Sequence, residues 1–366
     1  MTTLTSPLDG HSLATQSRIL MQVELRPAQG SRFQPTGFPD LGAAEYQAPL
    51  TGDNGRSTSR RMLLVESAQS VANRLETVCW DEAAGDLATP LAGMPYVVVT
   101  SNGQQITSSL QEAHRLNSPY ILEADGGRFK EQLKTDLEIK DAQPIDIGRL
   151  ARLALRYDPN SVLHGVFLAQ PDIAGGRYRL ARLLSGFIEA ADIEQAGSGE
   201  VKNDRVDPSG EAKAGFGNVP FHRTEYTART ITAYFNLDVA RLRSYRLGHG
   251  TGGHGEGLTP AEEFLVTLAF WKVRRFLETG LRLRTACDFE ADEGGLRVTR
   301  GGIVILPTDS LEARMKELIK ECGAAGLFAA PPVTRVEYAA GAGARKRRLK
   351  DRAGATMPAM TQEGDE

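Results

Sequence analysis

Two stretches with the pattern of β-strands flank a segment without periodicity, and this arrangement limits the folds open to the chain. The first is FIEAADI, residues 187–193. The second, YTARTITAYFNL at residues 226–237, alternates with a period of two and is rich in β-branched and aromatic residues. Residues 197–224 lie between them and are rich in Gly, Asp, Lys and Pro. The simplest geometry is two antiparallel strands joined by a long projecting loop.

Further elements follow from the same kind of pattern. Apolar residues recur at helical spacing from Glu66 to Trp80, which predicts an amphipathic helix. Thr259-Pro260-Ala261-Glu262 has the residues of a capping box with proline at the first helical position, so a buried helix should run to about Leu277. Other helices are expected at residues 147–157, at 178–184 and from Asp309 onward, the last capped at its start. Other strands are expected at residues 19–25, 95–100, 162–169 and 333–338, with a strand pair at 283–289 and 296–299.

This order of elements favours an α+β fold with a βαββαβ core and decorated loops. The predicted division is a flexible arm over residues 1–17, a single domain over 18–340 and a low-complexity tail over 341–366. Residues 28–59 resemble a long irregular connection, and residues 101–145 a finger-like insertion.

Composition narrows the class of protein. The chain has 366 residues, 41% of them apolar, and only three cysteines, Cys79, Cys287 and Cys322, which lie far apart. Such sparse cysteines argue against a disulfide framework and favour a reducing, cytoplasmic setting. No apolar run reaches about 18 residues, and the first 17 residues do not resemble a signal peptide, so we expect no membrane partner.

The net charge of −3 argues at first against a nucleic-acid partner, but positive charge is clustered. Segment 201–250 has eight basic and five acidic residues, and segment 335–352 has seven basic and two acidic residues. Arginine outnumbers lysine by 33 to 10, which suits phosphate and base contacts, although a GC-rich genome would give the same excess.

The start of the helix predicted at residues 66–80 has residues suited to holding phosphates. Ser67, Gln69, Ser70 and Asn73 are small hydrogen-bonding residues, and Arg60, Arg61 and Arg74 lie just upstream or on the helix. In the central loop, Phe216, Phe221, His222 and Tyr226 lie among charged residues, where stacking on bases would be useful. No aromatic consensus of a sheet that reads single-stranded RNA is present, so loops and helix ends are the expected contacts.

Motifs for enzyme chemistry are weak. Residues 248–253 match G-x-G-x-x-G literally, but no hydrophobic strand precedes them and no second strand ends in an acidic residue about 20 residues on. The loop opens into the capped helix at Thr259, so it could contact a phosphate. His249 and His254 lie in this loop without the further ligands that a zinc site needs. We therefore expect no cofactor, no metal and no catalytic residue.

Three motifs resemble one known family. They are RRMLLVESAQSVANRLE at residues 60–76, VPFHRTEY at residues 219–226 and Arg246-Leu247-Gly248. Together they resemble the repeat-forming backbone subunit of the type I-G CRISPR effector complex (Cascade), in the RAMP superfamily. The resemblance covers about residues 18–338.

The resemblance implies an RRM-like palm with inserted finger, thumb and web elements, and it implies no nuclease activity. Copies would stack head to tail along the spacer of a CRISPR RNA. The thumb, for which residues 197–224 are the candidate, would flip out one nucleotide at regular intervals. The segments between would pair with target DNA. Expected partners are the CRISPR RNA, the target DNA strand, other copies of the chain, the large Cascade subunit and the subunit that caps or processes the RNA end.

Two alternatives stay open. One is a RAMP-type endoribonuclease that uses His222 or His249, and the other is a nucleotide-dependent enzyme that uses the 248–257 loop. The main hypothesis is a non-catalytic RNA-binding subunit, and its candidate RNA-binding residues are Arg32, Arg60, Arg61, Ser67, Gln69, Ser70, Asn73, Arg74, Lys202, Arg205, Lys213, Phe221, His222, Arg223, His249 and Thr251.

Overall fold

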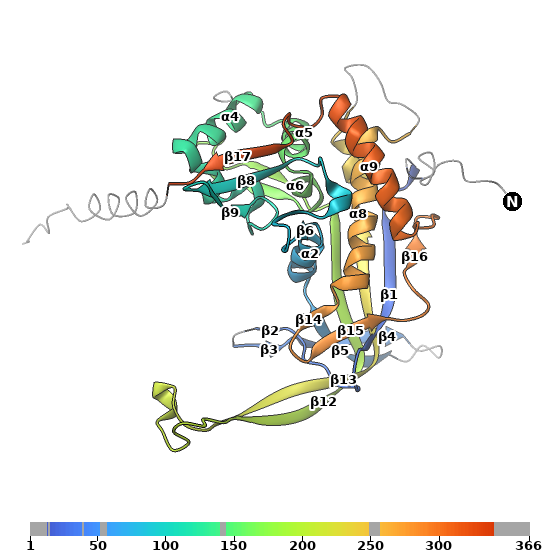
Figure 1. Ribbon diagram of the computed structural model, residues 1–366. Coiled ribbons are helices and arrows are strands. Elements are labelled where there is room, and N and C mark those ends of the chain that lie inside the picture. Colours follow the sequence, from blue (N-terminus) through green and yellow to red (C-terminus); the bar gives the residue numbers. More distant parts are fainter. Residues whose placement is uncertain are drawn as a thin grey trace, which may run out of the picture.

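The computed structural model describes residues 13, 15–38, 40–51, 57–139, 144–248 and 257–339 (Figure 1). Most of the predicted arm over 1–17 and all of the predicted tail over 341–366 lie outside these residues. The division into arm, single domain, finger-like insertion and tail stays a prediction.

An eight-stranded sheet forms the centre of the molecule, with the strand order β14-β15-β1-β13-β12-β5-β4 and β16 beside β1. All its strand pairs are antiparallel. The strands are β1 (Ile19–Pro27), β4 (Glu45–Thr51), β5 (Ser57–Glu66), β12 (Leu184–Lys202), β13 (Val219–Leu237), β14 (Arg282–Arg284), β15 (Cys287–Ala291) and β16 (Arg297–Arg300).

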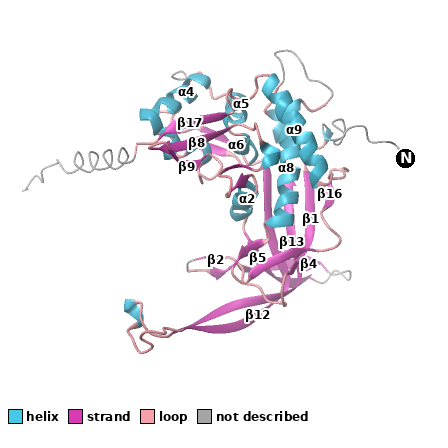
Figure 2. Cartoon of the chain, viewed as in Figure 1, coloured by secondary structure: helices cyan, strands magenta, loops and turns pink. Residues whose placement is uncertain are grey.

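One face of this sheet is buried under helices (Figure 2). Along β1, Ile19, Met21 and Val23 are buried, while the residues between them face the other way and are more exposed. The covering helices are α2 (Ala68–Thr77), α8 (Pro260–Thr279) and α9 (Thr308–Ala324). Helix α2 packs so closely on β12 that a Cβ at Gly186 would lie 3.0 Å from Val71. The period-two pattern of the strands therefore sets which face forms the core.

Helix α8 is the buried central helix that the sequence predicts. Thr259 and Glu262 cap its first turn reciprocally, which confirms the capping box. Helix α9 lies along it, held by a hydrogen bond of 3.0 Å from Trp271 Nε1 to Glu312 and by Arg314, which contacts Glu263 at 2.8 Å. Helix α9 has no side-chain cap, since Pro307 occupies the N-cap position, so the predicted cap there is wrong.

The elements β1, α2, β12, β13, α8 and β15 follow one another as β-α-β-β-α-β, and their strands lie in the order β15-β1-β13-β12. The pair β4-β5 extends the sheet beyond β12. The predicted α+β class is confirmed.

A second region packs beside the central sheet and contains a three-stranded sheet of order β17-β8-β9, in which β17 runs parallel to β8 (Figure 1). Small two-stranded sheets, β2-β3, β6-β7 and β10-β11, complete the strands of the described chain. The strands are β2 (Gly37–Phe38), β3 (Gly42–Ala43), β6 (Trp80–Asp81), β7 (Asp86–Leu87), β8 (Tyr96–Ser101), β9 (Gln104–Ser108), β10 (Val166–Leu168), β11 (Tyr178–Leu180) and β17 (Val333–Glu337). The remaining α-helices are α3 (Pro119–Leu122), α4 (Arg128–Asp136), α5 (Ile147–Tyr157), α6 (Pro159–Leu163) and α7 (Val239–Ser244).

Several element predictions are wrong, each for a local reason. Residues 28–59, predicted as an irregular connection, contain strand β4 and the first part of β5, in which Leu63 and Val65 point into the core while Met62 and Leu64 do not. Residues 178–184 are not helical, since Tyr178 and Leu180 alternate with Arg179 in a strand too short to show a period. Residues 162–169 are divided at Gly165, whose φ of +80° ends helix α6 before β10 begins.

The strands predicted at residues 283–289 and 296–299 do not pair with each other. Strand β15 pairs with β14 and β1, and β16 pairs with β1 at another place, so β15 and β16 both extend the same edge of β1. Turn residues between two strands indicate a reversal of the chain, but they do not say which strand becomes the neighbour.

A group of buried polar residues joins helices α2, α6 and α8. Arg115 donates two hydrogen bonds to Glu76, of 2.6 and 2.5 Å, and both side chains are almost fully buried. Lys272 is completely buried and contacts His164 Nε2 at 2.8 Å and the side-chain oxygen of Asn160. Burial and the Lys272 charge lower the pKa of His164 well below its usual value, so this imidazole is neutral.

This group generates a prediction about stability. Glu76→Gln removes the carboxylate and leaves the Arg115 cation buried without its counter-charge, so the free energy of unfolding should fall by about 3–5 kcal/mol. Urea denaturation measures it. The exposed pair of Glu24 and Arg297 is the control, because Glu24→Gln should cost at most about 1 kcal/mol. Equal losses in the two variants would contradict the stabilising role of the buried pair.

Candidate nucleic-acid interface

The most prominent feature of the surface is a two-stranded ribbon that leaves the body of the molecule (Figure 1). Strands β12 and β13 each have 19 residues and pair in one continuous register from Leu184–Leu237 to Lys202–Val219. Strand β12 pairs with β5 only up to Ala191, and β13 pairs with β1 only from Ile231. We call residues 193–228 the ribbon, since beyond the sheet its two strands pair chiefly with each other.

The ribbon corrects the prediction of a loop over residues 197–224. Residues 197–202 and 219–224 are paired strands, and only residues 203–218 connect them. Both faces of this outer part are largely exposed. Its sequence therefore does not need apolar residues at every second position. Hydrophobic patterning therefore could not reveal these strand ends, although the predicted antiparallel pair is present.

The ribbon bends where it leaves the sheet. Asp192 has a φ of +54°, and the Asp192–Arg229 pair is missing from a ladder that is regular on both sides of it. Aspartate is one of the few residues that adopt this left-handed conformation readily. The conformation of Asp192 thus marks the point at which the direction of the ribbon departs from that of the sheet.

Glu45 on β4 joins the base of the ribbon to the body. Its carboxylate accepts hydrogen bonds of 2.6 Å from the Tyr226 hydroxyl and 2.6 Å from the Gln195 amide, and one of 3.1 Å from Arg61. The hydrogen bond from Tyr226, followed by those from Gln195 and Arg61, lowers the pKa of Glu45. Phe33 adds a backbone bridge to Tyr226. Both strands of the ribbon are therefore held at their base.

Three of the predicted RNA-binding arginines also lie at this base. Arg61 pairs with Glu45 at 3.1 Å and with Glu194 at 3.2 Å, Arg60 pairs with Asp192 at 3.2 Å, and Arg32 pairs with Glu225 at 3.1 Å. More than a third of each arginine side chain stays exposed. These arginines fix the ribbon and still present unused N–H groups to solvent.

The other predicted basic and aromatic residues of this region lie along the ribbon itself. Lys202, Arg205 and Lys213 are exposed and form no ion pair within the described chain. The Arg223 guanidinium lies over the Phe221 ring at 5.3 Å and contacts Glu200 at 3.8 Å. His222 is exposed opposite Gly199. The ribbon thus brings all six predicted residues of segment 202–223 onto one projecting element.

Asp204 shapes the end of the ribbon. Its carboxylate accepts backbone hydrogen bonds from Val206 at 2.8 Å, Asp207 at 3.1 Å and Gly217 at 2.9 Å. These bonds lower the pKa of Asp204, so it stays ionised at neutral pH. Gly217 cannot be replaced without distortion, because a Cβ there would lie 2.2 Å from the Gly210 carbonyl oxygen.

The predicted phosphate site at the start of α2 is largely occupied by internal contacts. Ser67 caps the helix and accepts from the Ser70 backbone N–H at 3.3 Å. The buried Glu66 carboxylate accepts from Arg74 at 2.7 Å and from the Ser70 hydroxyl, and it pairs with Arg284. Gln69 and Asn73 are exposed but hydrogen-bonded to each other at 3.0 Å.

Arg60 and Arg61 do not join this helix start. Strand β5 separates Arg60 from Glu66 by six residues, or about 20 Å at the rise of an extended strand. The motif at residues 60–76 therefore contributes residues to two separate regions, the base of the ribbon and the start of α2.

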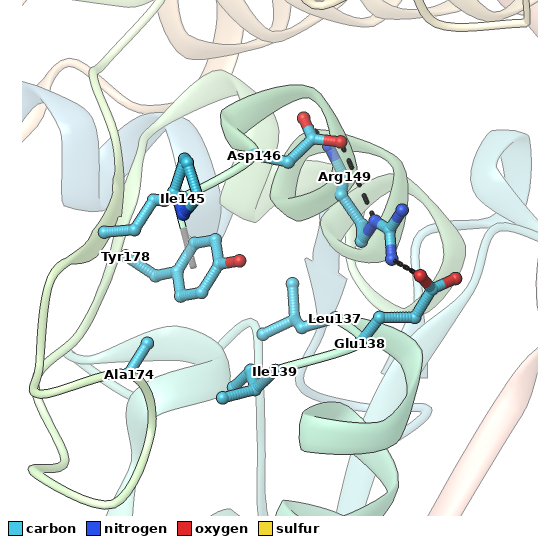
Figure 3. Close-up of a pocket in the computed structure, with 9 residues that line it drawn as sticks. Leu137, Glu138, Ile139, Ile145, Asp146, Arg149, Ala174 and Tyr178 are labelled. Atoms are coloured by element: carbon cyan, nitrogen blue, oxygen red, sulfur yellow. Dashed lines mark hydrogen bonds and ion pairs between the residues drawn. The ribbon is translucent and has the colours of Figure 1, made fainter. Parts of the chain in front are cut away.

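The 248–257 loop lies almost wholly outside the described residues, including the predicted contacts His249 and Thr251. Gly248 is described and lines a groove of about 550 Å³ with Arg149, Arg152 and Arg156 of α5. A smaller neighbouring pocket of about 100 Å³ lies between Ile139, Ile145 and Tyr178 (Figure 3). The Arg149 guanidinium on its rim pairs with Glu138.

No group of three or more His, Cys, Asp or Glu side chains in the described part of the chain is placed to hold a metal ion. No helix among the same residues is long and apolar enough to cross a membrane.

Sequence reasoning missed the residues that anchor the ribbon, chiefly Glu45 and Gln195, and also Arg182, which donates a hydrogen bond of 2.9 Å to Gln69. The strand pattern at residues 45–50 could have indicated β4, but its contact with residue 195 depends on a register that only the folded sheet fixes.

A prediction concerns the anchor. Glu45→Ala removes the shared acceptor of Tyr226, Gln195 and Arg61, so amide hydrogen exchange should rise at residues 193–196 and 225–228. Because the pKa of Glu45 is lowered in the fold, the wild-type anchor should also weaken as the pH falls through that pKa. Glu290→Ala, which breaks only the exposed pair with Arg26, is the control. Unchanged exchange in the ribbon of the Glu45 variant would refute the anchoring role.

Part of this chain is similar to known proteins. Residues 19–195 match the family model of the CRISPR-associated protein GSU0053. No curated protein matches the sequence. Two solved structures are similar at low identity. One is a chain of a CRISPR RNA-guided surveillance complex, pre-nicking, with 11% identity and a TM-score of 0.34, covering 75% of this chain and 76% of that one. The other is Csc2 of Thermofilum pendens, with 10% identity and a TM-score of 0.29, covering 88% and 81%.

The matched segment contains the motif at residues 60–76 and extends from β1 into the first part of the ribbon. It confirms the resemblance to a CRISPR-associated family that the motifs predict, while the type I-G assignment stays a prediction. Through residues 19–195, the chain carries the sequence signature of the CRISPR-associated protein GSU0053 family.

Proposed function

We propose that the chain is a non-catalytic, CRISPR RNA-binding backbone subunit of a type I-G effector complex. Several copies stack head to tail along the spacer of the guide RNA and present it for pairing with the target DNA strand. The large subunit and the subunit at the RNA end complete the assembly.

The topology supports an RRM-like palm in this proposal. The β-α-β-β-α-β order and the strand order β15-β1-β13-β12 are those of a ferredoxin-like core. The ribbon is the candidate thumb, and residues 101–145, which contain β9 and α4, are the candidate finger.

The ribbon is the observation that carries the proposal. Exposed cations that lack ion pairs among the described residues, Lys202, Arg205 and Lys213, lie at its outer end, where no apolar contact explains them. Unpaired cations on a projecting element are suited to a phosphate backbone, and contacts of this kind do not depend on base sequence. A two-stranded arm of this kind can fold over an RNA strand and hold one nucleotide out of its stack.

The first test replaces these three cations together by alanine. If each contacts a phosphate, affinity for single-stranded CRISPR RNA should fall about equally for all spacer sequences. The slope of log affinity against log salt concentration should become shallower by about 2, because each lost phosphate contact removes about 0.7 from it. Fluorescence anisotropy over a salt series measures both quantities.

A matched control removes the same charges elsewhere. Lys316, Lys320 and Arg335 are exposed and form no ion pair within the described part of the chain. Their triple alanine variant should keep the wild-type salt slope. A ribbon variant that behaves like this control, or a wild-type protein that binds no RNA at low salt, would refute the proposal.

The second test concerns stacking along the guide. Native mass spectrometry with RNAs of increasing length should show copy number rising by one for each fixed increment of nucleotides. The ribbon variant should bind fewer copies at the same concentration. A single copy on every RNA length would contradict the head-to-tail assembly.

No contact among the described residues supports either of the two enzyme alternatives. His222 lies on an exposed part of the ribbon, and His249 and the body of the glycine-rich loop lie outside the described residues. We assign no catalytic residue.

A further inference from the structure

The face of the central sheet that points away from α2 and α8 has a hollow of about 380 Å³. Its floor consists of two rows of side chains that the strand register aligns. Gln22, Tyr234 and Phe187 form one row across β1, β13 and β12. Leu20, Asn236 and Ser185 form the next row. Thr299 of β16 lies at the edge.

An aromatic pair occupies the middle of this face. The ring centroids of Phe187 and Tyr234 are 5.2 Å apart and the rings are tilted by only 31°. Phe187 is 36% exposed. A tilted stack of this kind leaves ring surface open toward the hollow, where a third flat ring can add to it.

Polar groups in both rows lack partners. The Asn236 side-chain oxygen is buried without a hydrogen bond. Gln22 and Ser185 have no side-chain hydrogen bond to any described residue. Amide and hydroxyl groups next to an aromatic platform can donate to and accept from the edge of a base.

Positive charge lies at the end of the same face. Arg300 is opposite Leu20 in the register, and Arg18 directly precedes β1 at the same end of the sheet. Both arginines are exposed and neither forms an ion pair with a described residue. An aromatic platform beside unpaired cations complements a nucleotide, which is an aromatic ring linked to an anionic phosphate.

We propose that this face binds one unpaired nucleobase of a single-stranded RNA. The base stacks on Phe187 and Tyr234, the amides of Gln22 and Asn236 contact its edge, and Arg18 and Arg300 contact the adjoining phosphate. The inference rests on the proposed RNA-binding function and deepens it. The ribbon holds the phosphate backbone, whereas this face takes a base.

The test compares two RNA probes on the full chain. One is a 12-nucleotide oligouridine, and the other is an oligomer of the same length and charge in which every base is absent. Wild type should bind oligouridine about tenfold more tightly than the abasic probe, because stacking adds to phosphate contacts. Phe187→Leu with Tyr234→Leu should bind the two probes about equally.

The matched control is Phe167→Leu, which changes an exposed phenylalanine of β10 outside this face. It should keep the tenfold preference, and circular dichroism should show that all variants are folded. A leucine pair keeps apolar volume at the platform, so loss of preference reports lost stacking.

Three results separate the possibilities. If the double variant keeps the wild-type preference for oligouridine, the base site is refuted while RNA binding stands. If wild type binds neither probe at low salt, the proposed function itself fails. If light scattering without RNA shows a dimer that the double variant cannot form, the face is a contact between copies and the base site is overturned.

Discussion

Continuous backbone pairing between β12 and β13 is the interaction on which the rest of the structure depends. The inner half of this ladder forms the middle of the central sheet, with β1 on one side and β5 on the other. The outer half forms the ribbon. One register thus determines both which residues enter the core under α2 and α8 and which residues reach solvent far from the body.

The sequence predicted the elements whose pattern is imposed by burial. Residues 226–237 and the amphipathic helix at α2 follow from their apolar periods, and the buried helix α8 follows from its capping box. The outer ribbon was missed because exposed strands show no clear alternation of apolar and polar residues. Strand β5 was missed because a helix follows it at once and obscures that alternation. Neighbours such as β16 beside β1 depend on packing of distant segments, which local patterns do not encode.

The candidate site shows the same division. Basic residues at 202–223 could be selected from charge alone, and the structure places them on one element. The role of Arg61 could not be read from the sequence, because its partners Glu45 and Glu194 are distant in the chain and meet only across the sheet. Arg74 is similar, since its partner Glu66 is buried at the junction of β5 and α2.

The length of the ribbon beyond Asp192 has a mechanical consequence. From there to Lys202 the ribbon extends ten residues, about 33 Å at the rise of a strand. A rotation of about 10° at the base therefore moves the far end by about 6 Å, so the hydrogen bonds of Glu45 to Tyr226 and Gln195 determine how precisely the far end is placed.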